Sequence, residues 1–229
     1  PSISAEPGRK ADVEQVAELG AATIRAFGGR AELHRVPGGS PIVLGSFESG
    51  KGRPTVTVYN HLDVQPASKE TEPWRTEPFE FRKLGDAYFG RGTTDDKGPA
   101  LTALFGARAA MDAGVPVNIK FLWETEEEIG SPHFAETLRA IGPAAATDAV
   151  VVSDTVWVSR GRPSLSAGLR GLQRMTFHLE TAETDQHSGT TGGVARNPVA
   201  ELAQIASEMF DARTGRVRIP GFYDDVEKL

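Results

Sequence analysis

The sequence predicts an α/β fold, a three-layer sandwich with a mainly parallel sheet, followed by a smaller α+β domain. The first observation is that short β-branched segments alternate with longer helical patterns as far as residue 160. The second is a change of composition after that point, where the chain becomes rich in Gly, Pro and Ser in RGRPSLSAGLRG. We therefore expect one domain over residues 1–160 and a second over residues 161–229.

The first elements follow from periodicity and turn residues. Apolar residues recur at helical spacing over residues 11–27, and Gly28-Gly29 ends that helix. The segments PIVLGSFE and PTVTVYN are β-branched and are separated by the turn-rich SGKGRP, so we expect neighbouring strands ending at Phe47 and Asn60. The segment PFEFRKLGDAYFGRG alternates about a Gly-Asp turn, which is typical of a hairpin.

The later elements continue the alternation. An alanine-rich helix is expected from Lys97 to Ala113, and a strand, VNIKFLW, follows it. The segment SPHFAETLRAIG offers Ser131 as a helix cap and Pro132 as the first helical residue, and DAVVVSD is the next strand. Beyond residue 160 come the alternating LQRMTFHLET, a glycine-rich loop and a helix from about Pro198.

Composition narrows the classes of partner. The chain has 229 residues, 39% hydrophobic and 24% charged, and no apolar run approaches the roughly 20 residues that span a bilayer. Its 25 Lys and Arg against 31 Asp and Glu give a net charge of −6, which offers no electrostatic support for nucleic acid or an anionic membrane. We therefore expect a small-molecule substrate. The absence of cysteine leaves His and carboxylates as the strong metal ligands and fits a cytoplasmic location.

Polar side chains follow the predicted strands where the strands end. Ligands of open α/β sheets bind beyond the carboxyl ends of the strands. Histidine and carboxylates that converge there without a thiol are the ligand set of a divalent metal. We therefore expect the four glutamates of FLWETEEEIGS to face cations. The candidate residues are His61, Asp63, Asp95, Glu127, Glu128 and Asp154.

Spacing within the motifs suggests distinct roles. In HLD the two polar side chains lie on the same side of an extended segment, so Asp63 can accept the second ring N–H of His61 and fix its tautomer. The adjacent Glu127 and Glu128 point different ways, which lets one hold a metal while the other moves a proton. The acidic quartet could instead be a solvated helix start. The apolar FLW that precedes it argues against a surface loop.

Taken together, the motifs resemble those of the M20 family of metallopeptidases, especially its carnosinase-like dipeptidase branch. The segments that carry the resemblance are YNHLDVQPA, YFGRGTTDDKGPA, ETEEEIGS, VVSDT and LSAGLRG. The resemblance implies a zinc-exopeptidase-like fold with a lid and dimerisation domain. It also implies two Zn²⁺ ions, with Co²⁺ or Mn²⁺ as alternatives, and hydrolysis of a peptide or amide bond near a free carboxylate.

The metal ligands that the resemblance implies come from four segments. His61 and Asp154 would bind the first zinc, Glu128 would bind the second, and Asp95 would bridge both. A cis peptide bond is implied after Asp95.

The remaining roles are also implied by the resemblance. Glu127 would be the general base and later the acid, and Asp63 would support the metal-binding histidine. His187, in TDQHSGTTGG, is similar to a histidine that reaches across a homodimer to substrate bound by the partner subunit.

The resemblance also leaves the activity of this chain open between several hypotheses. In the family a final metal-binding histidine lies far downstream, whereas this sequence stops at GFYDDVEKL, so we expect a fragment that is inactive alone. The leading hypothesis is a dinuclear zinc exopeptidase that cleaves dipeptides or short peptides. The alternatives are an N-acyl-amino-acid deacylase with the same chemistry and a non-catalytic binding or dimerisation module.

Overall fold

The computed structural model describes residues 1–166 and 168–227, and the chain divides into two compact units. The first unit is Pro1–Ala167 and the second is Gly168–Leu229. Ala167, inside the LSAGLRG motif, lies outside the described residues. Every predicted site residue except His187 belongs to the first unit.

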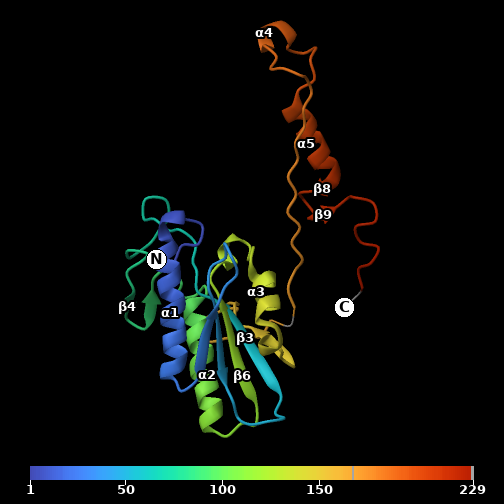
Figure 1. Cartoon of the computed structure of the whole chain (residues 1–229). Coiled ribbons are helices and arrows are strands. Elements are labelled where there is room, and N and C mark those ends of the chain that lie inside the picture. Colours follow the sequence, from blue (N-terminus) through green and yellow to red (C-terminus); the bar gives the residue numbers. More distant parts are fainter. Residues whose placement is uncertain (167, 228–229) are drawn as a thin grey trace. The chain divides into compact units, whose positions relative to one another are not determined.

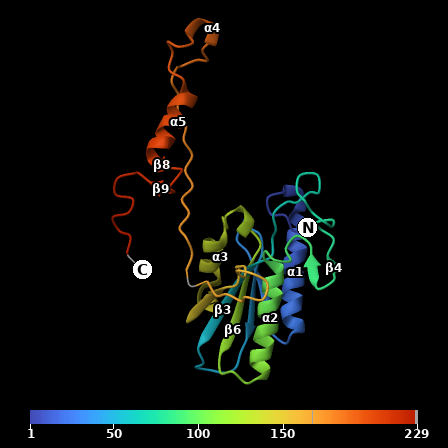
Figure 2. The same cartoon turned by 180° about the vertical axis from the view of Figure 1, so that it is seen from behind.

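A five-stranded sheet with the order β1-β2-β6-β3-β7 forms the centre of the first unit (Figures 1 and 2). Strands β6, β3 and β7 run parallel, whereas β2 is antiparallel to both β1 and β6. The α/β class is confirmed, and the sheet is mixed. The strands are β1 (Arg30–His34), β2 (Ile42–Phe47), β3 (Thr55–His61), β6 (Asn118–Glu124) and β7 (Ala149–Val152).

The segments PIVLGSFE and PTVTVYN form β2 and β3. The prediction that they are neighbouring strands is wrong, because β6 lies between them. The sequence of β6 explains its central place: Phe121, Leu122 and Trp123 are consecutive and all buried, and such a run suits a strand covered on both faces. Strand β1 was not predicted. Its sequence RAELH has little apolar character, as suits a sheet edge.

Helices cover both faces of the sheet and make three layers (Figures 1 and 2). Helices α1 (Lys10–Ala26) and α2 (Lys97–Asp112) lie on one face, and α3 (Phe134–Ile141) lies on the other. Strand β3 shows the alternation directly. Val58 packs against the core under α1 and α2, while the ring of Tyr59 lies 5.8 Å from that of Phe134 in α3.

Helix α1 packs closely behind the HLD segment. A Cβ atom at Gly20 would lie 2.9 Å from Leu62 Cδ1 and 3.2 Å from Trp123 Cε3, so a larger residue there would force these side chains to shift. Trp123 is 1% exposed, and burying a large apolar side chain contributes roughly 1.5–3 kcal/mol. The backbone that carries His61 and Asp63 is therefore supported from behind by the main core.

The start of α3 differs from the prediction. The helix begins at Phe134 rather than Pro132, and its N-cap residue is His133, whose side chain makes no capping bond. Ser131 has a φ of 51°, and its hydroxyl donates to Glu124 Oε1 at 3.0 Å. The serine was expected to cap the helix, but its hydroxyl donates a hydrogen bond to the buried Glu124 carboxylate instead.

Shorter elements complete the first unit. The predicted hairpin is confirmed as β4 (Arg82–Leu84) paired with β5 (Ala87–Phe89). Among the described residues of this unit, 3₁₀ turns also occur at Pro7–Arg9, Glu127–Ile129 and Gly142–Ala145.

The second unit contains α4 (Ser188–Thr191), α5 (Pro198–Met209) and a small hairpin of β8 (Phe210–Asp211) and β9 (Arg216–Val217). The helix from Pro198 is confirmed, and Asn197 caps it by accepting from two backbone N–H groups. The alternating segment LQRMTFHLET, residues 172–181, is not in a strand in the structure. Among the described helices, none is long and apolar enough to cross a membrane.

Candidate metal centre

The predicted site residues meet at the carboxyl ends of the parallel strands. His61 is the last residue of β3 and pairs in register with Glu124, the last residue of β6. Asp154 follows β7, whose continuation is held to β3 by the bond from Ser153 N to Tyr59 O, at 3.0 Å. Parallel pairing therefore brings three separate segments to one edge, where α/β sheets place their ligands.

Carboxylates surround one nitrogen of the His61 ring. Nε2 lies 2.8 Å from Asp95 Oδ1, 3.7 Å from Asp154 Oδ2 and 3.8 Å from Glu127 Oε2. The histidine side chain is 1% exposed, whereas Asp95 is 55% exposed. The site is thus open on the side of Asp95 and closed behind the histidine.

The other ring nitrogen faces Asp63. His61 Nδ1 lies 3.3 Å from Asp63 Oδ1 and 3.1 Å from the Asp63 backbone oxygen, so both neighbours are acceptors. In the neutral ring the proton therefore sits on Nδ1, and the lone pair of Nε2 faces the carboxylates. The expected support of His61 by Asp63 matches this geometry.

The Asp63 carboxylate also holds the turn that carries the two adjacent glutamates. The backbone N–H of Glu127 donates to Oδ1 at 3.3 Å, and that of Glu128 donates to Oδ2 at 3.0 Å. One buried side chain therefore fixes the ring of His61 and the start of the EEI turn at once.

Protonation in the cluster reflects an excess of negative charge. Burial lowers the pKa of His61, but the hydrogen bond and charge of Asp63, with the charges of Asp154 and Asp96, raise it to about 10. Burial raises the pKa values of Glu127 and Asp154, and the charge of His61 opposes both shifts. Carboxylates gathered in this way favour a cation among them.

Two buried carboxylate oxygens at the site are free to bind a metal. Among the described residues, Glu128 Oε1 and Asp96 Oδ1 have no hydrogen-bond partner. Two groups of residues bring their ligand atoms together, and within each group these atoms lie within 4.8 Å of one another. One group is His61, Asp95 and Glu128, and the other is His61, Asp96 and Asp154. Imidazole and carboxylate donors are those that Zn²⁺ and similar ions accept, so the residues fit a divalent metal.

Asp96 is a site residue that the sequence reasoning missed. Its side chain is fully buried, and Oδ2 accepts from Asn60 Nδ2 at 2.8 Å and from the backbone N–H of His61 at 3.1 Å. Burial raises its pKa to about 7 despite these two donors. The available signal was the doubled aspartate of TTDDKG. The peptide bond between Asp95 and Asp96 is cis, as the resemblance implied.

The expectation that all four glutamates face cations is wrong for two of them. Glu124 accepts from Tyr59 Oη at 2.6 Å and from Ser131, and burial raises its pKa. Glu126 accepts from the backbone N–H of Ser40 and pairs with His133 Nδ1, each at 2.9 Å. These two acids have protein partners, and Glu127 and Glu128 lie at the candidate centre.

His187 lies in the second unit and is described there only. Its side chain is exposed at the start of α4, where Nδ1 accepts from the backbone N–H of Gly189 at 3.0 Å.

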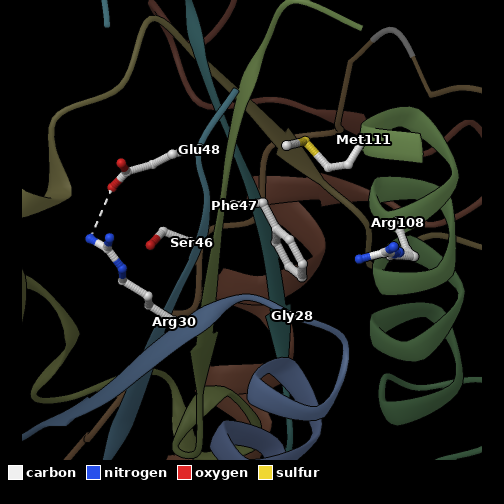
Figure 3. A pocket seen from close by; sticks show the side chains of 7 residues that line it. All are labelled: Gly28, Arg30, Ser46, Phe47, Glu48, Arg108 and Met111. Carbon is white, nitrogen blue, oxygen red and sulfur yellow. Dashed lines mark ion pairs between the residues drawn. The ribbon is translucent and has the colours of Figure 1, made fainter. Parts of the chain in front are cut away.

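A separate hollow of about 250 Å³ lies at the opposite end of the sheet (Figure 3). Phe47, on its wall, pairs with Ile119 at the start of β6, whereas the candidate centre lies beyond the end of β6. Figure 3 also shows an ion pair between Arg30 and Glu48 beside it, with a nitrogen–oxygen distance of 3.5 Å. None of the predicted site residues lines this hollow.

Fold and site together define an α/β protein with a candidate histidine–carboxylate metal centre at the carboxyl edge of its sheet. Residues 57–225 match peptidase family M20/M25/M40, and the chain belongs to this family. The resemblance found in the motifs is confirmed at the level of the family.

Curated relatives and solved structures agree with this assignment. The chain is 32% identical to Beta-Ala-His dipeptidase of Rattus norvegicus, covering 100% of this chain and 49% of the relative. It is 35% identical to Cys-Gly metallodipeptidase dug1 of Schizosaccharomyces pombe, covering 100% and 51%. The M20 family metallo-carboxypeptidase Sso-CP2 from Sulfolobus solfataricus matches with a TM-score of 0.79 and 32% identity, covering 100% and 51%. The chain thus spans about half the length of these proteins.

Proposed function

We propose that the protein is a metal-dependent dipeptidase that hydrolyses the amide bond of dipeptides or short peptides at a centre of two Zn²⁺ ions. The observation that carries the proposal is the convergence of three carboxylates on Nε2 of His61 in a chain of a peptidase family. The names of the relatives, Beta-Ala-His dipeptidase and Cys-Gly metallodipeptidase, support dipeptides as the substrate class.

The metal ligands in this proposal are His61, Asp95, Glu128 and Asp154. When bound, the metals supply a Lewis acid for the scissile carbonyl and lower the pKa of a water molecule. Glu128 is prepared as a ligand, because Gln65 Nε2 donates to its Oε2 at 2.8 Å while Oε1 is left without a partner among the described residues.

Glu127 is the proposed general base. Its side chain is 39% exposed and reaches within 3.8 Å of His61 Nε2, so it lies at the centre and is open to solvent. Burial, together with the charges of Glu128 and Asp154, raises its pKa. A carboxylate with a raised pKa is a stronger base toward the attacking water, and it holds the proton more readily near neutral pH for later transfer to the leaving amine.

His187 is proposed to bind substrate across a homodimer formed through the second unit. Because Nδ1 accepts from Gly189, the neutral ring carries its proton on Nε2 and can donate it to a substrate oxygen.

A cytoplasmic location stays a prediction, and the position of a tagged full-length protein in cells tests it.

A substrate panel on the full-length protein tests the function. Beta-Ala-His, Cys-Gly and other dipeptides are incubated beside N-acyl amino acids, before and after chelation and with Zn²⁺, Co²⁺ or Mn²⁺ restored. We expect dipeptide hydrolysis that chelation abolishes and metal restores. Cleavage of N-acyl amino acids alone would indicate a deacylase. No cleavage of any compound in the panel, with or without added metal, would indicate a binding module.

A further inference from the structure

The segment before α1 is built into the edge of the candidate centre. Ser2 is 1% exposed, and its hydroxyl donates to Leu62 O at 2.8 Å, while its backbone oxygen accepts from Val64 N at 3.0 Å. Lys97 Nζ donates to the same hydroxyl at 2.7 Å. The start of the chain is thus bonded to the main chain on both sides of Asp63.

Ser4 extends this contact to a side chain of the centre. Its Oγ donates to Asp63 Oδ2 at 2.6 Å, across 59 positions of sequence. Oδ2 also accepts from Glu128 N, and Oδ1 faces His61 Nδ1 and Glu127 N. Oδ2 therefore accepts from two donors, and Oδ1 accepts from Glu127 N with His61 Nδ1 3.3 Å away. Ser4 is the only one of these four groups that belongs neither to the histidine nor to the EEI turn.

We propose that Ser4 is a positioning residue of the metal centre, which acts through Asp63 on the ring of His61. The inference rests on the proposed function. The Ser4 hydroxyl fixes the rotation of the Asp63 carboxylate, so that Oδ1 stays directed at Nδ1 and Nε2 stays directed at the metal. Without it, Oδ2 retains only the Glu128 N–H, and the carboxylate can turn away from the ring.

Three variants separate positioning from simple anchoring of the segment. Ser4→Ala removes the donor to Asp63, and Ser4→Thr keeps a hydroxyl at that position. Ser2→Ala is the matched control, because it removes the bonds to Leu62 and Lys97 in the same segment and leaves Ser4 in place.

The probe is Co²⁺, added to the metal-free full-length proteins and followed by its visible absorption spectrum, with thermal unfolding measured in parallel. We expect Ser4→Ala to weaken Co²⁺ binding by about 10-fold, the lower end of the range for lost partners of metal-binding histidines, and to change the spectrum. Ser4→Thr should restore both. Ser2→Ala should lower the unfolding temperature while leaving the affinity unchanged.

The outcomes distinguish this inference from the function on which it rests. Wild-type protein that binds no Co²⁺ overturns the proposed function and this inference with it. Wild-type binding with equal affinity and spectrum in Ser4→Ala overturns the role of Ser4 alone. Equal loss of affinity in Ser4→Ala and Ser2→Ala also overturns it, because the segment would then act only as an anchor.

Discussion

Asp63 Oδ1 lies 3.3 Å from Nδ1 of His61, and neither side chain is more than 1% exposed. A buried carboxylate in this position selects the tautomer whose free nitrogen faces Asp95. The same carboxylate receives the backbone N–H groups of Glu127 and Glu128. The pair therefore couples the orientation of the histidine to the turn that carries the proposed base and the proposed ligand.

Replacing Asp63 with Asn tests this coupling. The amide keeps the shape but has only one acceptor oxygen and no charge, so the ring of His61 is held less firmly. We expect metal affinity of the full-length protein to fall by about 10- to 100-fold, the range typical of such partners. Competition with a chelator measures it, and circular dichroism controls for the fold. An unchanged affinity would show that the contact is incidental.

Metal binding should strengthen as pH rises. The pKa of His61 in the metal-free protein is about 10, above its ordinary 6.5, so the ring is protonated at neutral pH. A metal must displace that proton, and the apparent affinity should rise by about 10-fold per pH unit between about pH 7 and 9. Co²⁺ titrations across this range measure it, and a flat profile would contradict it.

The same raised pKa makes the stability of the metal-free protein fall, rather than rise, with increasing pH. Because the folded-state pKa of His61 is raised, its contribution to stability is fully present below pH 6.5 and is lost as pH rises through about 10. A ring titration by NMR on metal-free protein is the direct check. A His61 ring that is already neutral at about pH 8 would refute both pH predictions.

The two adjacent glutamates should separate by phenotype. Glu127→Gln should keep metal content and reduce turnover by about 10²- to 10⁴-fold, since a proton-transfer group is lost. Glu128→Gln should instead lower occupancy of the second metal, because Oε1 becomes part of an uncharged amide. Metal analysis beside kinetics on both full-length variants decides the matter, and the reverse pattern would exchange the roles.

The sequence predicts this site better than it predicts the sheet. Apolar runs that end in polar residues locate His61, Glu127 and Asp154, because such runs are buried strands and their ends share an edge. Strand order depends on which run is covered on both faces, and this is a property of the whole core. Local pattern therefore suggested the wrong neighbour for β3.

The side-chain partners of individual residues were also not predictable from the local pattern. Glu124 is hydrogen-bonded to Tyr59, and Glu126 is hydrogen-bonded to His133. Nothing in the spacing of the acidic quartet distinguishes these two glutamates from Glu127 and Glu128. The contact between Ser4 and Asp63 depends on the path of the chain before α1, which periodicity does not specify.

A pair of glycine substitutions tests the packing beneath the site. A Cβ at Gly45 would lie 2.6 Å from Ile24 Cδ1, so Gly45→Ala overpacks α1 against β2 and should cost about 1–3 kcal/mol. Gly106 in α2 has nothing within 4 Å of an added Cβ, so Gly106→Ala should stabilise by roughly 0.5–1 kcal/mol. Urea unfolding measures both. Equal effects would contradict the tight contact at Gly45.

The central claim, that these residues form a metal centre, is tested most directly by anomalous diffraction at the zinc edge on crystals of the full-length protein with Zn²⁺. We predict anomalous peaks at the carboxyl edge of the sheet, with His61 Nε2 and a carboxylate oxygen of Asp95 each about 2.0–2.2 Å from a peak. Asp154 and Glu128 should complete the ligands that this chain supplies. A peak elsewhere, with none beside His61, would contradict the assignment.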